Sequence, residues 1–197
     1  MLIVEGHAIH LDKNPNNLTN DELYDFCVMN QELRIERDAQ QNIIIMAPVG
    51  GYSGYREIEF MTEINIWVRK NGGIAFSSST GFLMPNGAMR SPDACWVSEE
   101  RWSTITAEQK KKFPPVTPDF VVEVRSATDS LKTAKAKMEE WIENGVRLGW
   151  LVDFQNKQVF IYREDGSIEI VKGLQHKLSG EKVLEGFEFN LKQLKMP

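Results

Sequence analysis

The sequence predicts an α/β protein in which a mixed sheet carries helices on its faces. Two observations lead to this class. The central elements follow in the order helix, strand, strand, strand, helix, strand, and short hairpin patterns flank them on both sides. With 197 residues, of which 42% are hydrophobic and 26% charged, the chain has enough apolar side chains for one domain spanning residues 1–197.

The first elements are short. Thr19 and Glu22 form a capping box, which predicts a helix that ends near residue 30. Residues 33–35 and 43–46 have the pattern of a two-stranded hairpin. Residues 48–54 are rich in glycine but lack the Lys and Ser/Thr of a phosphate-binding loop, so we expect a plain connection there.

The first long helix is expected over residues 57–68. Its hydrophobic spacing directs four side chains toward the core: Ile58, Met61, Ile64 and Trp67. Three acidic residues of this helix are interpreted as a solvated face: Glu57, Glu59 and Glu63.

The remaining elements are strands and one further helix. Strands are predicted at residues 74–83, 90–98, 119–125 and 150–153, with a last hairpin at 157–163 and 168–172. Asp129 or Ser130 caps a helix that ends near Asn144, and Gly145 follows it.

Composition narrows the class of protein. Cys27 and Cys95 provide neither a disulfide framework nor a metal-ligand cluster, which predicts a reduced, cytoplasmic protein. No apolar run approaches the roughly 20 residues that span a bilayer, and no signal peptide is recognisable, so we expect no membrane partner. His7 and His10 have zinc-site spacing without further ligands and are interpreted as surface residues. The net charge of −5 argues against coating nucleic acid by bulk charge but allows a local basic groove.

Two carboxylates carry the strongest chemical pattern. Side chains alternate along a strand, so Asp119, Glu123 and Arg125 point to one face of their strand. Asp119 lies roughly 13 Å from Glu123, too far to share an ion, and is interpreted as a strand-start or capping residue. Asp93 begins the preceding strand and can lie beside Glu123. Because Mg²⁺ takes one or two carboxylates with waters and phosphate oxygens, this pair predicts a metal-dependent phosphodiesterase.

A cation is needed to face the charge that develops on the phosphoryl oxygens. Arg125 can serve, although it cannot act as a base and could simply form an ion pair with Glu123. Lys135 and Lys137 border the apolar stripe of the last helix, and spacing alone leaves the choice between them open.

At these positions the chain resembles a known family. Four segments carry the resemblance: 118–126 (PDFVVEVRS), Lys137, 145–146 (GV) and 150–153 (WLVD). They resemble a widespread bacterial family of restriction-endonuclease relatives, the Uma2-like proteins, within the PD-(D/E)xK nuclease superfamily. Residues 34–36, 45–48 and 90–93 extend the resemblance over most of the chain from Leu18 onward.

The resemblance implies a restriction-endonuclease-like αβββαβ core with accessory β-hairpins. It implies that Asp93 and Glu123 are the carboxylates for Mg²⁺ or Mn²⁺. The superfamily's E-x-K lysine falls at Arg125, and the lysine that has moved to the following helix in this family matches Lys137. Glu36 matches a recurring glutamate, which is either a further ligand or a structural partner. Some nucleases of the superfamily carry one more acid on the helix that holds Glu57, Glu59 and Glu63.

The implied function is a metal-dependent DNA endonuclease that hydrolyses phosphodiester bonds. Its catalytic residues are then Asp93, Glu123, Arg125 and Lys137, and a homodimer is expected because cutting both strands takes two sites. The alternative is an inactive nuclease-fold module that binds DNA or a protein partner. The arginine at position 125 and the acidic net charge favour that alternative. The intact carboxylate pair with Lys137 opposes it, since a scaffold needs no cluster of like charges.

Overall fold

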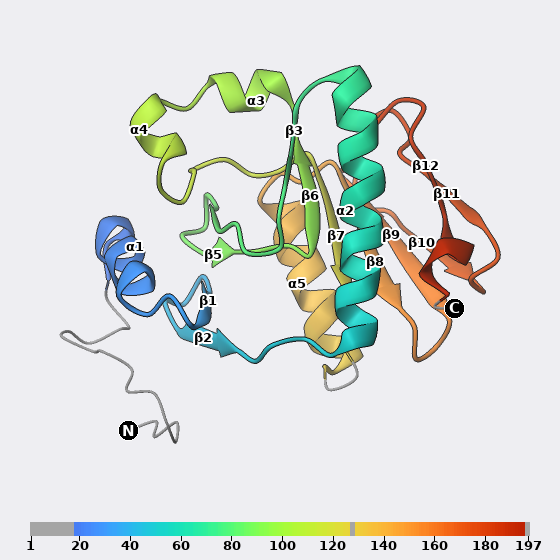
Figure 1. Cartoon of the computed structure of the whole chain (residues 1–197), viewed down its shortest axis with the longest axis horizontal. Coiled ribbons are helices and arrows are strands. Elements are labelled where there is room, and N and C mark those ends of the chain that lie inside the picture. Colours follow the sequence, from blue (N-terminus) through green and yellow to red (C-terminus); the bar gives the residue numbers. More distant parts are fainter. Residues whose placement is uncertain (1–17, 127–128, 196–197) are drawn as a thin grey trace.

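A central sheet of six strands forms the middle of the molecule (Figure 1). The structure is a computed structural model, and it describes residues 18–126 and 129–195. His7 and His10 lie outside the described residues. Across the sheet the order is β10 (Ile168–Lys172), β9 (Gln158–Arg163), β8 (Leu148–Asp153), β7 (Phe120–Val124), β6 (Ala94–Val97) and β3 (Ile74–Phe76). Only the β7–β8 pair is parallel among these neighbours, so the predicted mixed sheet is confirmed.

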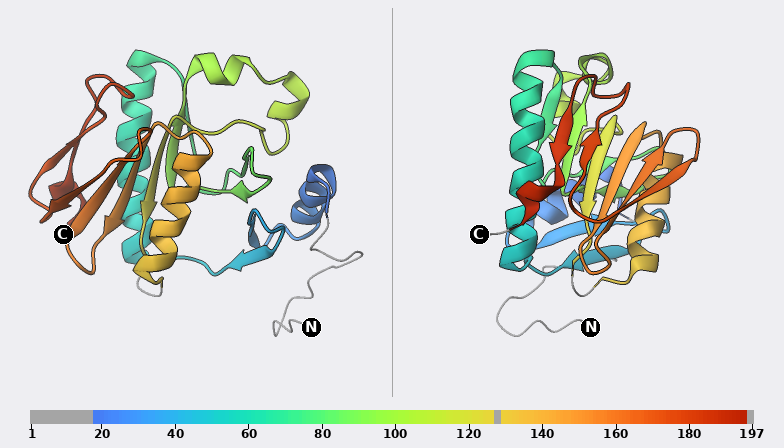
Figure 2. Two further views of the ribbon diagram at one scale, coloured as in Figure 1. Left: turned by 180° about the vertical axis from the view of Figure 1, so that it is seen from behind. Right: turned by 90° about the vertical axis from the view of Figure 1, so that its right-hand side faces the viewer.

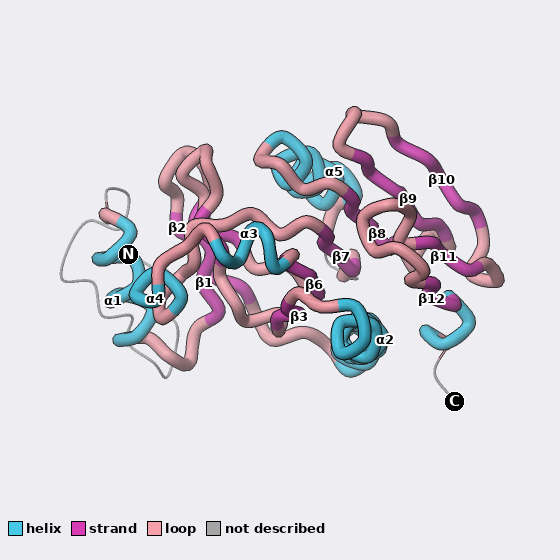
Figure 3. Tube along the Cα trace, turned by 90° about the horizontal axis from the view of Figure 1, so that it is seen from above, coloured by secondary structure: helices cyan, strands magenta, loops and turns pink. Residues whose placement is uncertain are grey.

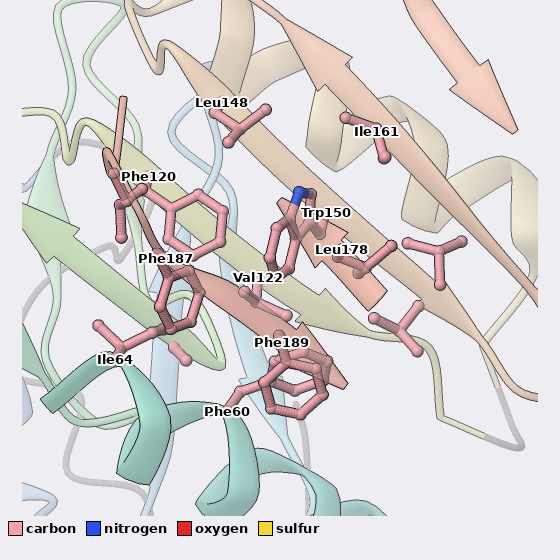
Figure 4. Close-up of a cluster of buried hydrophobic side chains, with 14 of the residues drawn as sticks. Phe60, Ile64, Phe120, Val122, Leu148, Trp150, Ile161, Leu178, Phe187 and Phe189 are labelled. Carbon is pink, nitrogen blue, oxygen red and sulfur yellow. The ribbon is translucent and has the colours of Figure 1, made fainter. Parts of the chain in front are cut away.

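Two helices cover the sheet from opposite sides (Figure 2). On one face, α2 (Gly51–Asn71) packs Phe60 and Ile64 against Phe120 and Trp150 (Figure 4). On the other face, α5 (Leu131–Glu143) packs Met138 and Trp141 against Val121 and Leu151. Because strand residues alternate, β7 sends every second side chain into each layer. The predicted order of helix, three strands, helix and strand is therefore present as α2, β3, β6, β7, α5 and β8.

A second, four-stranded sheet lies beside the core on the N-terminal side (Figure 3). Its order is β2 (Ile43–Met46), β1 (Arg34–Arg37), β5 (Met89–Arg90) and β4 (Phe82–Leu83). The helix α1 (Asn20–Met29) begins at the predicted capping box of Thr19 and Glu22 and packs Leu23 against Met89. The hairpin of β1 and β2 confirms the prediction for this region.

The other elements are short. They are α3 (Glu99–Ser103), α4 (Ala107–Lys110), β11 (Lys177–Ser179), β12 (Glu188–Asn190) and a 3-10 helix (Leu191–Leu194). The C-terminal segments place Leu178 and Phe189 on the α2 side of the core. Over 18–126 and 129–195, none of the helices combines the length and apolarity that a bilayer crossing requires.

Two sequence predictions about the long helix are wrong. The long helix begins at Gly51, so most of the Gly-rich segment predicted as a connection forms its first turn. Its phase also differs, because Glu57 is buried while Ile58, predicted inward, is 53% exposed. Because the buried stripe contains the polar Glu57, the spacing of hydrophobic residues predicted the wrong phase for this helix.

Two predicted strands are in fact split between the two sheets. Residues 74–83 form β3 and β4, separated by a turn in which Thr80 N–H donates to Ser77 O over 3.0 Å. Residues 90–98 divide at Pro92, which has no N–H for a ladder, into the end of β5 and all of β6. Because the chain crosses between sheets here, Arg90 belongs to one sheet and Asp93 stands at the start of the other.

Candidate functional site

Asp93 and Glu123 lie side by side. In the antiparallel register of β6 and β7, Ala94 pairs with Val122, so the next positions outward are Asp93 and Glu123. Asp93 Oδ2 accepts a hydrogen bond from the Val124 N–H at 2.7 Å. Both carboxylates are 8% exposed. Two buried acids thus lie next to one another at the end of the sheet where β6 begins and β7 ends.

Lys137 reaches this pair from α5. Its Nζ lies 2.9 Å from Glu123 Oε1 and donates to Glu123 Oε2 at 3.1 Å. It also donates to Glu36 Oε1 at 3.0 Å and to the carbonyl oxygen of Ser91 at 3.3 Å. One lysine therefore joins carboxylates from the central sheet and the accessory sheet.

Helical spacing left the choice between Lys135 and Lys137 open, and of the two it is Lys137 that contacts the carboxylates. Lys135 lies on the other border of the stripe, with its Nζ 4.2 Å from the centroid of the Phe160 ring. Trp141, one turn beyond Lys137, donates its Nε1–H to Glu123 Oε1 at 2.9 Å. Trp141 lies in the apolar stripe of this helix, and that spacing by itself indicates only a core residue. Its spacing of four from Lys137 places both donors on one helical face.

Glu36 has partners for both of its oxygens. Oε1 accepts from Lys137 and from the Ser91 N–H at 3.0 Å, while Oε2 accepts from Arg90 at 3.1 Å. Arg90 is fixed further by Glu140 at 2.7 Å. Burial would raise the pKa of Glu36, but Lys137 and Arg90 outweigh it and hold that pKa below its ordinary value. Of the two roles open from the sequence, the contacts favour a structural partner.

The central carboxylates have the opposite electrostatic balance. Burial raises the pKa of Asp93 to about 6, and Glu57 adds to this effect against the opposing Lys137. Burial raises the pKa of Glu123 to about 7, and Asp93 and Glu36 reinforce the shift. Burial would lower the pKa of Lys137, but the surrounding acids raise it and keep the ammonium protonated. The cluster carries more negative charge than Lys137 neutralises.

Glu57 is a further acid that sequence reasoning assigned wrongly to a solvated face. It is 7% exposed on α2, and burial raises its pKa, with Arg34 opposing the shift and Glu123 adding to it. Arg34 also approaches Asp93, with NH2 3.5 Å from Oδ1. The available signal was the resemblance, since some nucleases of the superfamily carry an extra acid on the equivalent helix.

Arg125 and Asp119 lie in other interactions. The guanidinium of Arg125 donates NH1 to Asp153 Oδ1 at 3.0 Å and Nε to the carbonyl oxygen of Asp129 at 3.0 Å. Asp119 Oδ2 accepts from the Ser98 N–H at 2.8 Å, and its Oδ1 lies 3.2 Å from Arg101. The capping role expected for Asp119 fits these contacts. The ion-pair partner of Arg125 is Asp153 on β8 rather than Glu123.

Comparisons with known proteins identify a family and a similar structure. A family model described as "Uma2: Putative restriction endonuclease" matches residues 20–192. The chain belongs to the Uma2 family. A crystal structure described as "a putative nuclease belonging to DUF820", from Anabaena variabilis, is similar with a TM-score of 0.71 and 20% identity. The match covers 90% of this chain and 97% of that chain, and it confirms the predicted fold class. None of the curated proteins matches the sequence.

The oxygen donors of this Uma2-family cluster fit a divalent cation. Carboxylate oxygens are the ligands that Mg²⁺ and Mn²⁺ prefer, and the raised pKa values mark negative charge that a cation would relieve. Within the described part of the chain, no group of three His, Cys, Asp or Glu side chains has metal-binding geometry. Asp93 and Glu123 would therefore share the ion with waters and substrate oxygens, which is the usual manner of Mg²⁺.

The Arg125 contacts give a first testable prediction. We expect Arg125→Ala to lower the free energy of unfolding by about 3 kcal/mol, because it leaves the buried Asp153 without its cation. We expect metal affinity to be unchanged, since the pair is separate from Asp93 and Glu123. Urea denaturation and Mn²⁺ titration calorimetry measure the two quantities. A large loss of metal affinity without destabilisation would contradict this and indicate that Arg125 belongs to the metal site.

Proposed function

We propose that this protein is a metal-dependent endonuclease that hydrolyses phosphodiester bonds in DNA. The observation that carries the proposal is Lys137 held between Glu36 and Glu123, with Glu123 next to Asp93 in the sheet. Membership of a family described as putative restriction endonucleases supports it, as does the likeness to a structure described as a putative nuclease. Asp93, Glu123 and Lys137 are the proposed catalytic residues, and Glu57 is a further acid on the site's border.

In this proposal Asp93 and Glu123 hold Mg²⁺ or Mn²⁺. When bound, the ion supplies Lewis-acid polarisation of the scissile phosphate and makes a bound water more acidic. Trp141 donates to Glu123 Oε1 and fixes the orientation of that carboxylate. The backbone N–H of Val124 does the same for Asp93. Both ligands are thus held in place by hydrogen bonds before any substrate arrives.

Lys137 acts as a cation and hydrogen-bond donor. Its neighbouring acids raise its pKa, so the ammonium stays protonated at neutral pH and has three N–H donors. These donors hold Glu123, Glu36 and the Ser91 carbonyl, and from this place the ammonium charge can face the charge that develops on the phosphoryl oxygens. This argues against proton abstraction by Lys137, because an ammonium group cannot accept a proton.

Nicking of supercoiled plasmid tests the proposal. We expect the parent protein to nick with Mn²⁺ or Mg²⁺ and Glu123→Ala to lose at least about 100-fold of that activity, because it removes a metal ligand. Glu139→Ala is the matched control, since Glu139 lies on the same helix as Lys137 but is exposed. It should nick like the parent. Cleavage that persists in Glu123→Ala, or no cleavage by the parent with either ion, would favour the inactive nuclease-fold module.

A homodimer is part of the proposal, because cutting both strands of a duplex takes two sites. The edge strand β10 offers one surface for it: Ile168 and Ile170 are about half exposed there. Light scattering coupled to size-exclusion chromatography measures the mass in solution, and a monomer mass at all concentrations would remove the dimer from the proposal.

A further inference from the structure

The arginines around the carboxylate cluster differ in how many of their donors are used. Arg90 is bound by Glu36 and Glu140, and Arg125 by Asp153 and the Asp129 carbonyl. In Arg37, three contacts to Leu18, Asn20 and Gly87 occupy both terminal nitrogens. The buried Nε of Arg37 has no acceptor among the described residues, but both of its terminal nitrogens are bound within the protein. These three arginines have structural roles, since most of their hydrogen-bonding capacity is satisfied by the protein itself.

Arg34 is different. Its contact with Asp93 Oδ1 is long, at 3.5 Å, and its buried Nε has no acceptor among the described residues. The side chain is 25% exposed, so solvent or a ligand can reach the guanidinium. A buried donor without an acceptor is costly, and one that stands beside a metal-binding carboxylate is suited to an anion delivered with the metal.

Arg56 has the same property at the same end of the sheet. Its guanidinium carbon lies 3.4 Å from the centroid of the Phe154 ring, and Phe154 directly follows β8. Its Nε is buried without an acceptor, and within residues 18–126 and 129–195 it has no ion-pair partner. Figure 1 places the first turns of α2 at the end of the sheet where α5 begins. Stacking on the ring fixes the plane of the guanidinium and leaves its outer edge available.

We propose that Arg34 and Arg56 bind two phosphates of the nucleic-acid strand that enters the carboxylate cluster. Arg34 binds the phosphate beside Asp93, and Arg56 binds a neighbouring one. The inference rests on the proposed function and adds to it the surface along which the phosphate backbone lies. It also reconciles a net charge of −5 with a polyanionic substrate, because two guanidinium groups with an unused Nε donor lie at the end of the sheet that carries the carboxylate cluster.

The test is the salt dependence of binding to a fluorescein-labelled DNA duplex, with Ca²⁺ in place of Mg²⁺. Each phosphate contact contributes about 0.9 to the slope of log affinity against log salt. Arg34→Gln and Arg56→Gln should therefore each lower the slope by about one. Between about 50 and 200 mM salt, the parent should weaken about 3.5-fold more than either variant. Arg69→Gln is the matched control: the residue is exposed in the last turn of α2, about 20 Å from Arg56.

Two further measurements separate phosphate binding from structural support of Asp93. Arg34→Gln should bind Mn²⁺ at least as tightly as the parent, because a competing cation has been removed. Arg34→Lys should restore the slope, because a point charge still neutralises a phosphate, but only part of the cleavage rate, because the planar fork is lost. Weaker Mn²⁺ binding by Arg34→Gln with an unchanged slope would overturn the assignment.

The outcomes also separate this inference from the proposed function. If the parent binds the duplex and both variants have a reduced slope, but the parent never cleaves, the phosphate-binding surface is supported and the nuclease function is contradicted. If the parent cleaves and the slopes of Arg34→Gln, Arg56→Gln and Arg69→Gln are identical, the nuclease function is supported and the phosphate-binding surface is contradicted. A parent that neither binds nor cleaves would remove both.

Discussion

Replacing Lys137 by alanine is expected to abolish metal-dependent cleavage and to lower the free energy of unfolding by about 3 to 5 kcal/mol. Lys137 is the nearest cation to Glu123, with contacts at 2.9 and 3.1 Å to its two oxygens. Glu36 keeps Arg90 after the substitution, whereas Glu123 keeps only the neutral Trp141 donor. A buried carboxylate would therefore be left without compensation. Plasmid nicking and urea denaturation measure the two effects.

Lys135→Ala is the matched control for this variant. It removes the same charge from the same helix, but its ammonium lies over the Phe160 ring, a contact worth about 0.5 to 1 kcal/mol. We expect its cleavage to equal that of the parent. Lys137→Gln separates catalysis from folding, because it keeps a donor and much of the volume. Cleavage within tenfold of the parent in a folded Lys137→Gln protein would contradict the role given to this ammonium.

The second large effect is expected for Asp93→Asn, in opposite directions for function and stability. The amide can still accept from the Val124 N–H, but it cannot supply the anionic ligand, so Mn²⁺ binding and cleavage should be lost. The metal-free protein should become more stable, because one buried charge is removed from a cluster that also holds Glu57 and Glu123. Calorimetry with Mn²⁺ measures the first effect and urea denaturation the second.

The stability gain should depend on pH with a defined sign. Burial raises the pKa of Asp93 from 3.8 in the unfolded chain to about 6 in the folded protein. Below about pH 4 the carboxyl is neutral in both states, so parent and variant should have similar stabilities. Between about pH 4 and 6 the parent loses stability as ionisation becomes costly, and above that the difference stays near its limit of about 3 kcal/mol.

The exposed Asp25 supplies the control for this pair of effects. Asp25→Asn should leave Mn²⁺ affinity, cleavage and the pH dependence of stability unchanged. Lower stability of Asp93→Asn than of the parent at pH 7 would contradict the description of the cluster as electrostatically strained.

The Asp93–Glu123 pair could be predicted because it depends only on short-range rules. Alternation along a strand predicts the face on which Glu123 lies, and antiparallel pairing with the preceding strand places Asp93 opposite it. Lys137 required more, since helical spacing admitted Lys135 equally, and only the family resemblance separated them.

Other features depend on strand order and tertiary context. Arg125 contacts Asp153 because β8 lies next to β7 in the sheet, which no local pattern indicates. Glu57 is buried within an otherwise apolar stripe, where a carboxylate looks like an error of phase until its neighbours are known. Trp141 has a side-chain N–H that matters only because Glu123 lies opposite it. Arg125 and Glu57 depart from the hydrophobic pattern that predicts the rest of the fold, whereas Trp141 follows that pattern and only its N–H has a further role.

The contact between Lys137 and Glu36 joins positions 101 residues apart. Closing a contact over so long a stretch of chain has a larger entropic cost than forming a local helix or hairpin. A growing chain that has completed β6 already contains Glu36 and Asp93, but Glu123 and Lys137 are still to be synthesised. On the proposed function, the catalytic site would therefore be complete only once the accessory sheet has docked against α5.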